Sequence, residues 1–356
     1  MKGLILAAGR GTRLRPLTHT RPKPVIRVAG RPIIHYAIKN LIDAGVSRVG
    51  IVVSPATLTD VRAAYNGFEE SIGIGIDYIL QEQPQGLAHA VSVARDWLGE
   101  DDFVLYLGDN LFERGIVDFV DSFRELQPQA VVALAQVENP RQFGVAEVDG
   151  EEIRRLVEKP KTPPSNLAVA GVYVFSPRIH EIIAGLEPSA RGEYEITDAI
   201  QGLIDGGGKV LGLPISGWWK DTGRAEDLLD ANRLLLSGLE RKVDGEVSDC
   251  SRLIGPVVVE EGARVLGSTV VGPALIASGS LVENAFVGPF TSVGPEAVVR
   301  DSEVEYSILA DRAVVEGVKT RLQECVIGVG AWVASRQGLP KAHRLVLGDE
   351  SRVEIG

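Results

Sequence analysis

The chain has 356 residues, of which 45% are hydrophobic and 24% charged, and a formal net charge of −11 at pH 7. This negative charge disfavours a nucleic-acid partner, and no stretch approaches the roughly 20 apolar residues that a membrane helix needs. Two cysteines without metal-ligand spacing, Cys250 and Cys325, favour a reducing cytoplasm over a disulfide framework. The length predicts two domains.

The first part of the chain alternates strand-like and helix-like segments. Residues 3–8 form a continuous apolar run typical of a buried strand. Residues 32–44 carry apolar side chains at helical spacing, with a proline at the start and a glycine after the end. Further strands are expected at 49–53, 76–80 and 103–107, and a helical segment at 87–98. The pattern predicts an α/β fold with a doubly wound, mixed but mostly parallel sheet, and ligands beyond the carboxyl ends of its strands.

The periodicity changes after about residue 245. Aliphatic residues then recur about every six positions, at Leu253, Val259, Val265, Val271, Ile276, Val282, Val287, Val293 and Val299, and in the later pairs Ile308 with Val314 and Ile327 with Val333. Such a period predicts a parallel β-helix of about four to five coils, and a regular β-sandwich is the alternative. We therefore expect domains at 1–240 and 245–335, a joining helix at 224–239, and a tail at 336–356 without a clear pattern.

A basic, glycine-containing loop follows the first strand. Gly9 and Gly11 allow close backbone approach, and Arg10, Arg13 and Arg15 follow at short intervals. Leu14 replaces the third glycine of a dinucleotide fingerprint, and no Walker A ending is present. The loop can instead wrap a polyphosphate with backbone N–H groups and guanidinium forks, although a solvated basic turn is the alternative.

The string Gly9-x-Gly11-Thr12-Arg13-Leu14-x-Pro16-x-Thr18, followed by Lys23-Pro24, resembles the signature of sugar-1-phosphate nucleotidyltransferases. The resemblance covers nearly all of the first 240 residues and is strongest to the long-form, glucose-specific thymidylyltransferases. It implies a Rossmann-like nucleotidyltransferase domain followed by a left-handed parallel β-helix. It also implies Mg²⁺ as cofactor, with a nucleoside triphosphate (dTTP favoured, UTP second) and glucose 1-phosphate as substrates.

The resemblance assigns roles to charged residues in separate motifs. Asp109 and Asp221 are the expected Mg²⁺ ligands, and Arg13, Lys23 and Asp109 the expected catalytic residues. Without the resemblance, Asp109 is explained equally well as a turn residue after a strand, and Asp221 as the N-cap of the following helix. Because Mg²⁺ is held by one or two carboxylates together with phosphate oxygens and waters, two aspartates suffice.

Two further sets of residues are assigned to the substrates. The expected nucleotide-binding residues are Leu6, Ala8, Gly9, Gly11, Thr12, Arg13, Gln81, Pro84 and Gly86. The expected residues around the sugar phosphate are Asn110, Gly144, Glu158, Lys159, Val169, Gly171, Tyr173 and Arg191. The Gln81 amide offers both a donor and an acceptor to a pyrimidine edge. Glu158 and Lys159 could instead be an exposed turn pair, and Tyr173 a core aromatic. Ala8 departs from the glycine common in the family, which is harmless if its φ is negative.

Other functions remain open at this stage. A UTP- or GTP-dependent enzyme would share the first loop, and a non-catalytic regulator that binds nucleotide sugars would share the fold. A second, acetyltransferase site in the β-helix is disfavoured, because none of the five histidines, His19, His35, His89, His180 and His343, lies within the repeats. We expect the β-helix to support a homo-oligomer.

Overall fold

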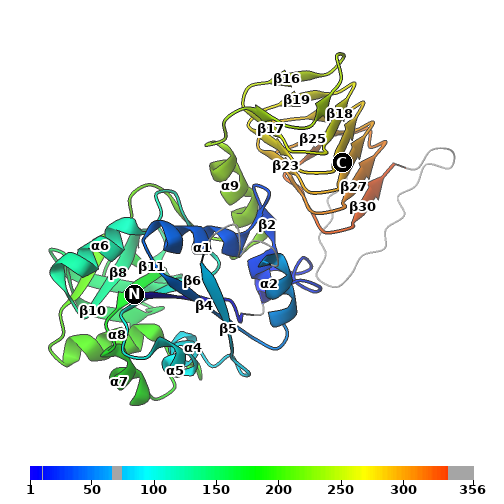
Figure 1. Cartoon of the computed structure of the whole chain (residues 1–356). Coiled ribbons are helices and arrows are strands. Elements are labelled where there is room, and N and C mark those ends of the chain that lie inside the picture. The colour runs from blue at the N-terminus through cyan, green and yellow to red at the C-terminus, as the bar shows by residue number, and fades with distance from the viewer. Residues whose placement is uncertain (10, 66–73, 336–356) are drawn as a thin grey trace. The chain divides into compact units, whose positions relative to one another are not determined.

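The computed structural model describes residues 1–9, 11–65 and 74–335. Their contacts divide the chain into two compact units (Figure 1). The first contains Met1–Arg10, Arg21–Val25 and Ile33–Asp221, and the second contains Gly11–Thr20, Ile26–Pro32 and Thr222–Gly356. Two short segments near the N-terminus thus group with the C-terminal part, which no sequence pattern indicated. The domain boundaries at 240 and 245 stay a proposal.

A nine-stranded sheet forms the centre of the first unit, in the order β5-β4-β1-β6-β11-β8-β12-β10-β9. Its strands are β1 (Lys2–Leu6), β4 (Arg48–Val53), β5 (Gly75–Leu80), β6 (Phe103–Leu107), β8 (Ala130–Gln136), β9 (Gly144–Asp149), β10 (Glu152–Glu158), β11 (Leu167–Phe175) and β12 (Val210–Pro214). Strands β10 and β11 pair antiparallel with their neighbours, whereas β5, β4, β1 and β6 are parallel to one another, as are β8 and β12. The predicted mixed, mostly parallel sheet is confirmed.

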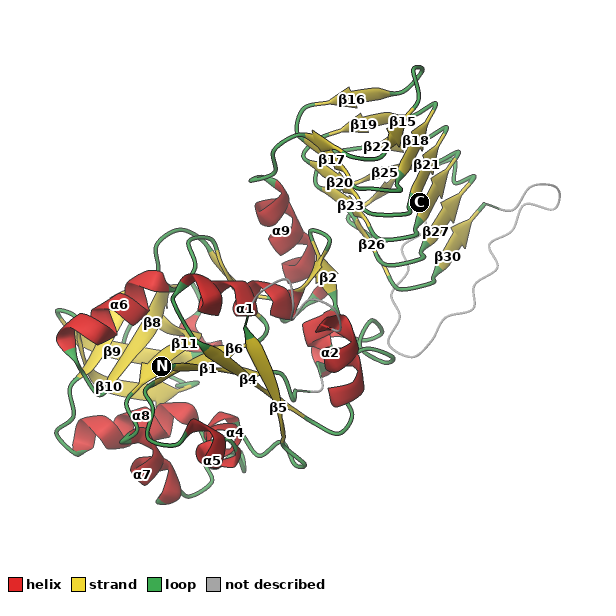
Figure 2. Ribbon diagram, viewed as in Figure 1, coloured by secondary structure: helices red, strands yellow, loops and turns green. Residues whose placement is uncertain are grey.

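Helices cover both faces of this sheet (Figure 2). They are α1 (Ile33–Asp43), α2 (Leu58–Tyr65), α4 (Leu87–Val93), α5 (Arg95–Leu98), α6 (Val117–Leu126), α7 (Ile179–Ala184) and α8 (Ile196–Asp205). Successive strand residues point to opposite faces, so Ile5 packs in the core under α1 and α6, and Leu4 in the core with α4, α7 and α8. The expected single helical segment at 87–98 is wrong at Ala94, where the backbone (φ −86°, ψ 0°) separates α4 from α5.

The repeats of the second unit form three parallel sheets, the arrangement of the predicted left-handed parallel β-helix. The first sheet contains β14 (Lys242–Val243), β17 (Val257–Val259), β20 (Ala274–Ile276), β23 (Thr291–Val293), β26 (Ile308–Leu309) and β29 (Val326–Ile327). The second contains β15 (Glu246–Val247), β18 (Arg264–Leu266), β21 (Leu281–Glu283), β24 (Val298–Arg300), β27 (Val314–Glu316) and β30 (Trp332–Ala334). The third contains β16 (Arg252–Ile254), β19 (Thr269–Val271), β22 (Phe286–Val287), β25 (Glu303–Glu305) and β28 (Leu322–Gln323).

The β-helix core follows the repeat with three slips. Val259, Ile276 and Val293 lie in register and are fully buried, as the period predicts. In β19 and β27, however, Val270 and Val315 are the buried residues, and the expected Val271 and Val314 are only partly buried. In β26, Leu309 lies in register with Val293 and belongs to the β-helix core, whereas the expected Ile308 pairs with Ser292 and is not part of that core. Because side chains alternate along a strand, a one-residue slip moves the apolar position to the other face.

The second unit also contains helix α9 (Ala225–Leu236) and a hairpin of β2 (Arg27–Val28) and β3 (Arg31–Pro32). The N-cap of α9 is Arg224, whose N–H donates to Asp227 at 2.8 Å. Asp221 lies in another strand, β13 (Trp219–Asp221), so its interpretation as the helix cap is wrong. Over the described residues, no helix is long and apolar enough to cross a membrane.

Replacement of Val299 by Ala should destabilise the β-helix, because the fully buried side chain stacks between Val282 and Val315. We expect the free energy of unfolding to fall by about 1.5–3 kcal/mol. The matched control is Val298→Ala, in the same strand on its partly exposed face. Urea unfolding followed by circular dichroism measures both, and equal losses would contradict the inward assignment.

Candidate active site

Two aspartates that are far apart in the sequence come together through one short strand pair. Strand β13 pairs antiparallel with β7 (Asn110–Phe112), which places Asp221 opposite Asn110. Asp109 immediately precedes β7, in the two-residue turn that follows β6. Gly108 permits this turn, because a Cβ there would lie 2.9 Å from the Leu6 carbonyl oxygen.

A single lysine contacts both aspartates. The Nζ of Lys23 lies 2.6 Å from Asp109 Oδ2 and 3.5 Å from Asp221 Oδ1. The Lys23 side chain is 8% exposed, so its charge is largely removed from solvent and compensated by the two carboxylates. Burial alone would raise the pKa of Asp109, but the Lys23 ammonium and the hydrogen bonds from Lys23 and Asn110 outweigh it and lower that pKa. Asp109 is thus held in its ionised form.

Asn110 orients Asp109 instead of facing open space. Its Nδ2 donates to Asp109 Oδ1 at 2.8 Å, and its Oδ1 accepts from Trp219 Nε1 at 2.7 Å. The residue is 3% exposed, and Gly171 leaves room for it, since a Cβ at Gly171 would lie 2.9 Å from the Asn110 amide carbon. Its predicted contact with the sugar phosphate stays a prediction beside this observed contact.

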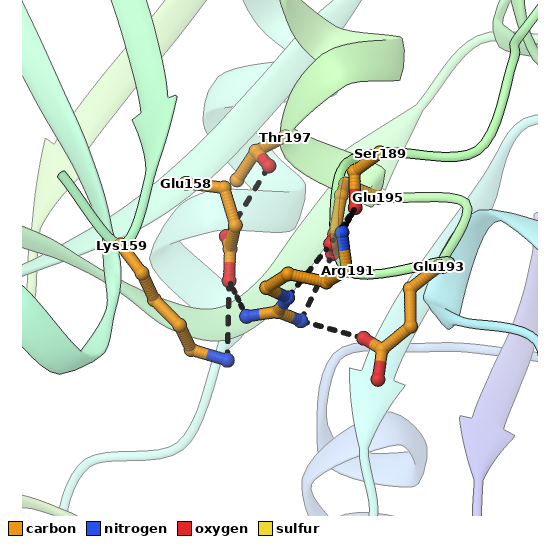
Figure 3. A network of polar contacts seen from close by, with 7 residues as sticks. All are labelled: Glu158, Lys159, Ser189, Arg191, Glu193, Glu195 and Thr197. Atoms are coloured by element: carbon orange, nitrogen blue, oxygen red, sulfur yellow. Dashed lines mark hydrogen bonds and ion pairs between the residues drawn. The ribbon is translucent and has the colours of Figure 1, made fainter.

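A second polar cluster surrounds Glu158 at the end of β10 (Figure 3). The Oε1 of Glu158 lies 3.4 Å from both Lys159 Nζ and Arg191 Nη1. Its Oε2 accepts from Thr197 Oγ1 at 3.2 Å. Lys159 has a left-handed backbone (φ 39°), and its N–H donates to the Phe143 carbonyl. One carboxylate oxygen of Glu158 thus lies between the two cations, and the other accepts the hydrogen bond from Thr197.

Arg191 is held by further carboxylates. Its Nη2 donates to Glu193 at 2.6 Å, and its Nε lies 3.2 Å from Glu195 Oε1, which also accepts from Ser189 Oγ at 2.9 Å. Burial raises the pKa of Glu195, although Ser189 and Arg191 oppose that shift. The guanidinium is thus anchored beside Glu158, another residue that the resemblance assigned to the sugar phosphate.

The remaining residues expected near the sugar lie around this cluster or beneath it. A Cβ at Gly144 would lie 2.7 Å from Thr197 Cγ2 and 3.3 Å from Glu158 Oε2, so the glycine makes room for the side chains that position Glu158. Val169 is buried. Tyr173 is 3% exposed and its ring stacks on Phe175, which matches the core-aromatic alternative.

The expected base-reading residues make contacts that the sequence did not indicate. Gln81 is buried, and its Nε2 lies 2.9 Å from His89 Nδ1. Gly86 has a φ of 111°, and a Cβ there would lie 2.5 Å from the Tyr194 carbonyl oxygen. Pro84 is exposed. This glycine is therefore required by the crossing of two backbone segments, whatever its relation to a base.

The basic, glycine-containing loop after β1 includes residues of both units. Leu6, Ala8 and Gly9 end β1 and follow it in the first unit, and Ala8 is not among the residues with positive φ, as its substitution for glycine requires. Gly11 and Thr12 belong to the second unit, where Thr18 Oγ1 donates to the Gly11 carbonyl at 2.7 Å. There the Arg13 guanidinium covers Gly223, whose hypothetical Cβ would lie 3.1 Å from Arg13 Nη1. Arg10 lies outside the described residues.

Trp219, Thr197 and His89 were missed by the sequence-based assignment. Trp219 lies two residues before Asp221, and Thr197 six residues after Arg191, but nothing in a single sequence says that they contact Asn110 and Glu158. His89 lies one helical turn after Gly86, and its polar side chain is the sequence feature that could have identified it.

Comparison with known proteins finds a matching family model and similar proteins. Residues 2–238 match the family model described as nucleotidyl transferase. The chain aligns over its whole length with a glucose-1-phosphate thymidylyltransferase from Streptomyces griseus. The identity is 49%, and the alignment covers 99% of that protein. The chain is 46% identical to 99% of a glucose-1-phosphate thymidylyltransferase from Streptomyces antibioticus, also over the whole chain.

A solved structure shares part of this fold. UDP-glucose pyrophosphorylase, crystallised with UDP-glucose, is 27% identical and superposes with a TM-score of 0.61 over 66% of this chain and 98% of that one. The family model spans most of the described chain, and both Streptomyces proteins align with the chain over its whole length. The chain therefore belongs to the nucleotidyl transferase family.

Proposed function

We propose that the protein is a glucose-1-phosphate thymidylyltransferase, which converts dTTP and glucose 1-phosphate to dTDP-glucose and pyrophosphate. The observation that carries the proposal is the convergence of Asp109 and Asp221 on Lys23 Nζ. It supplies paired carboxylates and a cation, the groups that nucleotidyl transfer needs. The identity of 49% over the full length to a relative with this name supports the choice of substrates.

Mg²⁺ is the proposed cofactor, and the residues present fit it. Asp109 and Asp221 both reach the same ammonium nitrogen, so one cation can contact both carboxylates. Mg²⁺ prefers such hard oxygen ligands and completes its octahedron with waters and phosphate oxygens. When bound, the ion would neutralise charge that develops on the transferred phosphate.

The proposed chemistry is a single in-line displacement. An oxygen of the glucose 1-phosphate attacks the α-phosphorus of dTTP, the bond from that phosphorus to the bridging oxygen breaks, and pyrophosphate leaves with the electron pair. A phosphate monoester is largely ionised at neutral pH, since its second pKa is about 6, so no general base is required. Lys23 is proposed to hold the α-phosphate, Arg13 the β- and γ-phosphates, and Lys159 the attacking phosphate. Catalysis then rests on positioning and charge neutralisation.

The cluster around Glu158 is proposed to bind the sugar. A carboxylate fixed by Thr197 and Arg191 accepts hydrogen bonds from sugar hydroxyls in a defined direction. The neighbouring Lys159, whose side chain is 44% exposed, is free to turn towards a phosphate. Glucose is favoured because the relatives act on glucose 1-phosphate by name.

The base is proposed to be read near Gln81. Thymine and uracil differ by one methyl group, which is worth only about 1–3 kcal/mol in a pocket. Some use of UTP beside dTTP is therefore expected, and the likeness to a UDP-glucose enzyme keeps UTP as the second candidate. A regulator that has lost catalysis is disfavoured, because Arg13, Lys23, Asp109, Lys159 and Asp221 are all present.

A homo-oligomer and a cytoplasmic location complete the proposal. In the described residues both Cys250 and Cys325 are free thiols, which suits a reducing compartment. Light scattering after size-exclusion chromatography measures the oligomeric state, and a 38.2 kDa monomer at micromolar concentration would contradict the proposed assembly.

Asp109→Asn and Asp221→Asn should each lower kcat by at least about 100-fold, because each removes a charge from the metal and nucleotide site. Asp109→Ala and Arg13→Ala should have similar effects without unfolding the protein. Pyrophosphate release measures turnover, and titration with Mn²⁺ monitored by electron paramagnetic resonance measures metal binding directly. Asp121→Asn, on the surface of α6, is the matched control. Unchanged turnover in the Asp109 or Asp221 variants would contradict the assignment.

Glu158→Gln should raise the KM for glucose 1-phosphate by about 10–100-fold, since a charge-assisted hydrogen bond contributes roughly 1.5–3 kcal/mol. The KM for dTTP should change by less than threefold. Glu152→Gln, at the other end of the same strand and partly exposed, is the control. A rise in the KM for dTTP alone would contradict the assignment of Glu158 to the sugar.

The nucleotide preference is tested by pyrophosphate release with glucose 1-phosphate, Mg²⁺ and each of dTTP, UTP, CTP, ATP and GTP separately. The proposal expects the fastest turnover with dTTP and a slower one with UTP. Turnover with GTP or ATP alone would keep the chemistry but contradict the substrate. No turnover with any triphosphate, or with mannose, galactose or N-acetylglucosamine 1-phosphates, would favour the regulatory alternative.

A further inference from the structure

The second unit contains more than the β-helix. Gly11–Thr20, which carries Arg13, and Ile26–Pro32, which begins three positions after Lys23, both group with Thr222–Gly356. More than 200 residues of sequence separate these segments from the β-helix strands that they accompany. Specific contacts inside this unit must therefore hold them.

Asn232 joins three of its parts. This residue of α9 is completely buried. Its Oδ1 accepts from the Ala29 N–H at 2.9 Å and from Ser292 Oγ at 2.6 Å, and its Nδ2 donates to the Phe290 carbonyl at 2.9 Å. One side chain thus connects the β2–β3 hairpin, α9 and strand β23 of the β-helix.

The hairpin fits the β-helix sterically as well as through hydrogen bonds. Gly30 has a φ of 79°, and a Cβ there would lie 2.3 Å from Leu275 Cδ2 in β20. Arg27 donates from Nη1 to the Gly30 carbonyl at 2.8 Å, and its Nε lies 3.0 Å from Asp311 Oδ1. The turn between β2 and β3 is therefore shaped to this one surface, which is formed by β20, β23 and Asp311, the second residue after β26.

The phosphate-binding loop rests on the same body. The Arg13 guanidinium lies over Gly223, two residues before α9 begins. Leu17, at the far end of the loop, approaches Gly328, where a hypothetical Cβ would lie 3.6 Å from Leu17 Cδ2. A continuous series of contacts thus leads from β23 through Asn232 and α9 to Arg13.

These contacts exceed what the β-helix needs for its own stability. Its core is apolar and is formed by residues of its own coils. A buried asparagine with both polar atoms bonded defines one arrangement, because any shift leaves buried polar groups unsatisfied. A junction that only held the segments together would not require a buried, hydrogen-bonded asparagine.

We propose that Asn232 is a positioning residue, which uses the β-helix as a support to hold α9, and through it Arg13, in the geometry that grips the triphosphate. This inference rests on the proposed function for the phosphate-binding role of Arg13. It assigns the C-terminal β-helix a part in nucleotide binding, in addition to the assembly role expected above.

Asn232→Ala in the full-length protein tests the proposal. We expect the KM for the triphosphate, and its Kd measured by isothermal titration calorimetry with dTTP and Mg²⁺, to rise at least tenfold. The KM for glucose 1-phosphate should stay within twofold. Asn232→Asp keeps the Oδ1 acceptor and should show an intermediate effect.

Ser268→Ala is the matched control for lost stability. Ser268 is also buried, and its Oγ bonds Leu266, Val282 and Ala285, but it precedes β19 in another sheet of the β-helix. Ser268→Ala should lower the Tm while leaving the triphosphate KM within twofold. A triphosphate KM within twofold in Asn232→Ala, with a similar loss in Tm, would overturn the proposal.

A second variant decides the matter if Asn232→Ala does not fold. Ser292→Ala removes only the hydrogen bond from Ser292 Oγ to Asn232 Oδ1, and we expect it to raise the triphosphate Kd by about threefold; no rise would overturn the proposal. Failure of the proposed function is seen separately, because it would leave the wild-type protein without turnover. The Kd comparison between variants does not depend on turnover.

Discussion

The electrostatic balance between Lys23 and two aspartates is the constraint on which the site depends. Two carboxylates brought together repel each other, and burial makes that repulsion worse. Lys23 compensates both, at 2.6 Å from Asp109 and 3.5 Å from Asp221. The pairing of β7 with β13 exists at the place where these charges must meet, and Asn110 and Trp219 fix the orientation of Asp109. The strand pairing thus brings the two carboxylates together, and Lys23 compensates their charge.

The cluster around Glu158 follows the same rule with more charges. Glu158, Glu193 and Glu195 surround Arg191, and Lys159 adds a second cation beside Glu158. An arginine held by fixed acceptors loses little conformational entropy when a ligand arrives. Gly144 shows how far the backbone adapts, because the absent side chain makes room for Thr197 and Glu158. The position of Glu158 thus depends on Gly144 and Thr197.

The sequence predicted the architecture well because its signals are local. Apolar runs located β4, β5 and β6 to within a residue or two, and the hexapeptide period located the β-helix. Errors arose where local patterns carry no information: the interruption at Ala94, the slips at Val270, Leu309 and Val315, and the cap of α9. The grouping of Gly11–Thr20 with the C-terminal unit depends on contacts across some 200 residues, which one sequence cannot reveal. For the site, residue types were predictable, whereas their partners, such as Asn110 with Trp219, were not.

The most direct test of the central claim is a crystal structure of the complex with Mn²⁺, glucose 1-phosphate and a non-hydrolysable dTTP analogue, with anomalous diffraction to locate the metal. The account predicts a single anomalous peak within about 2–2.5 Å of carboxylate oxygens from Asp109 and Asp221, with Lys23 on the α-phosphate. A metal bound by neither aspartate, or a nucleotide whose phosphates lie away from Lys23, would contradict it.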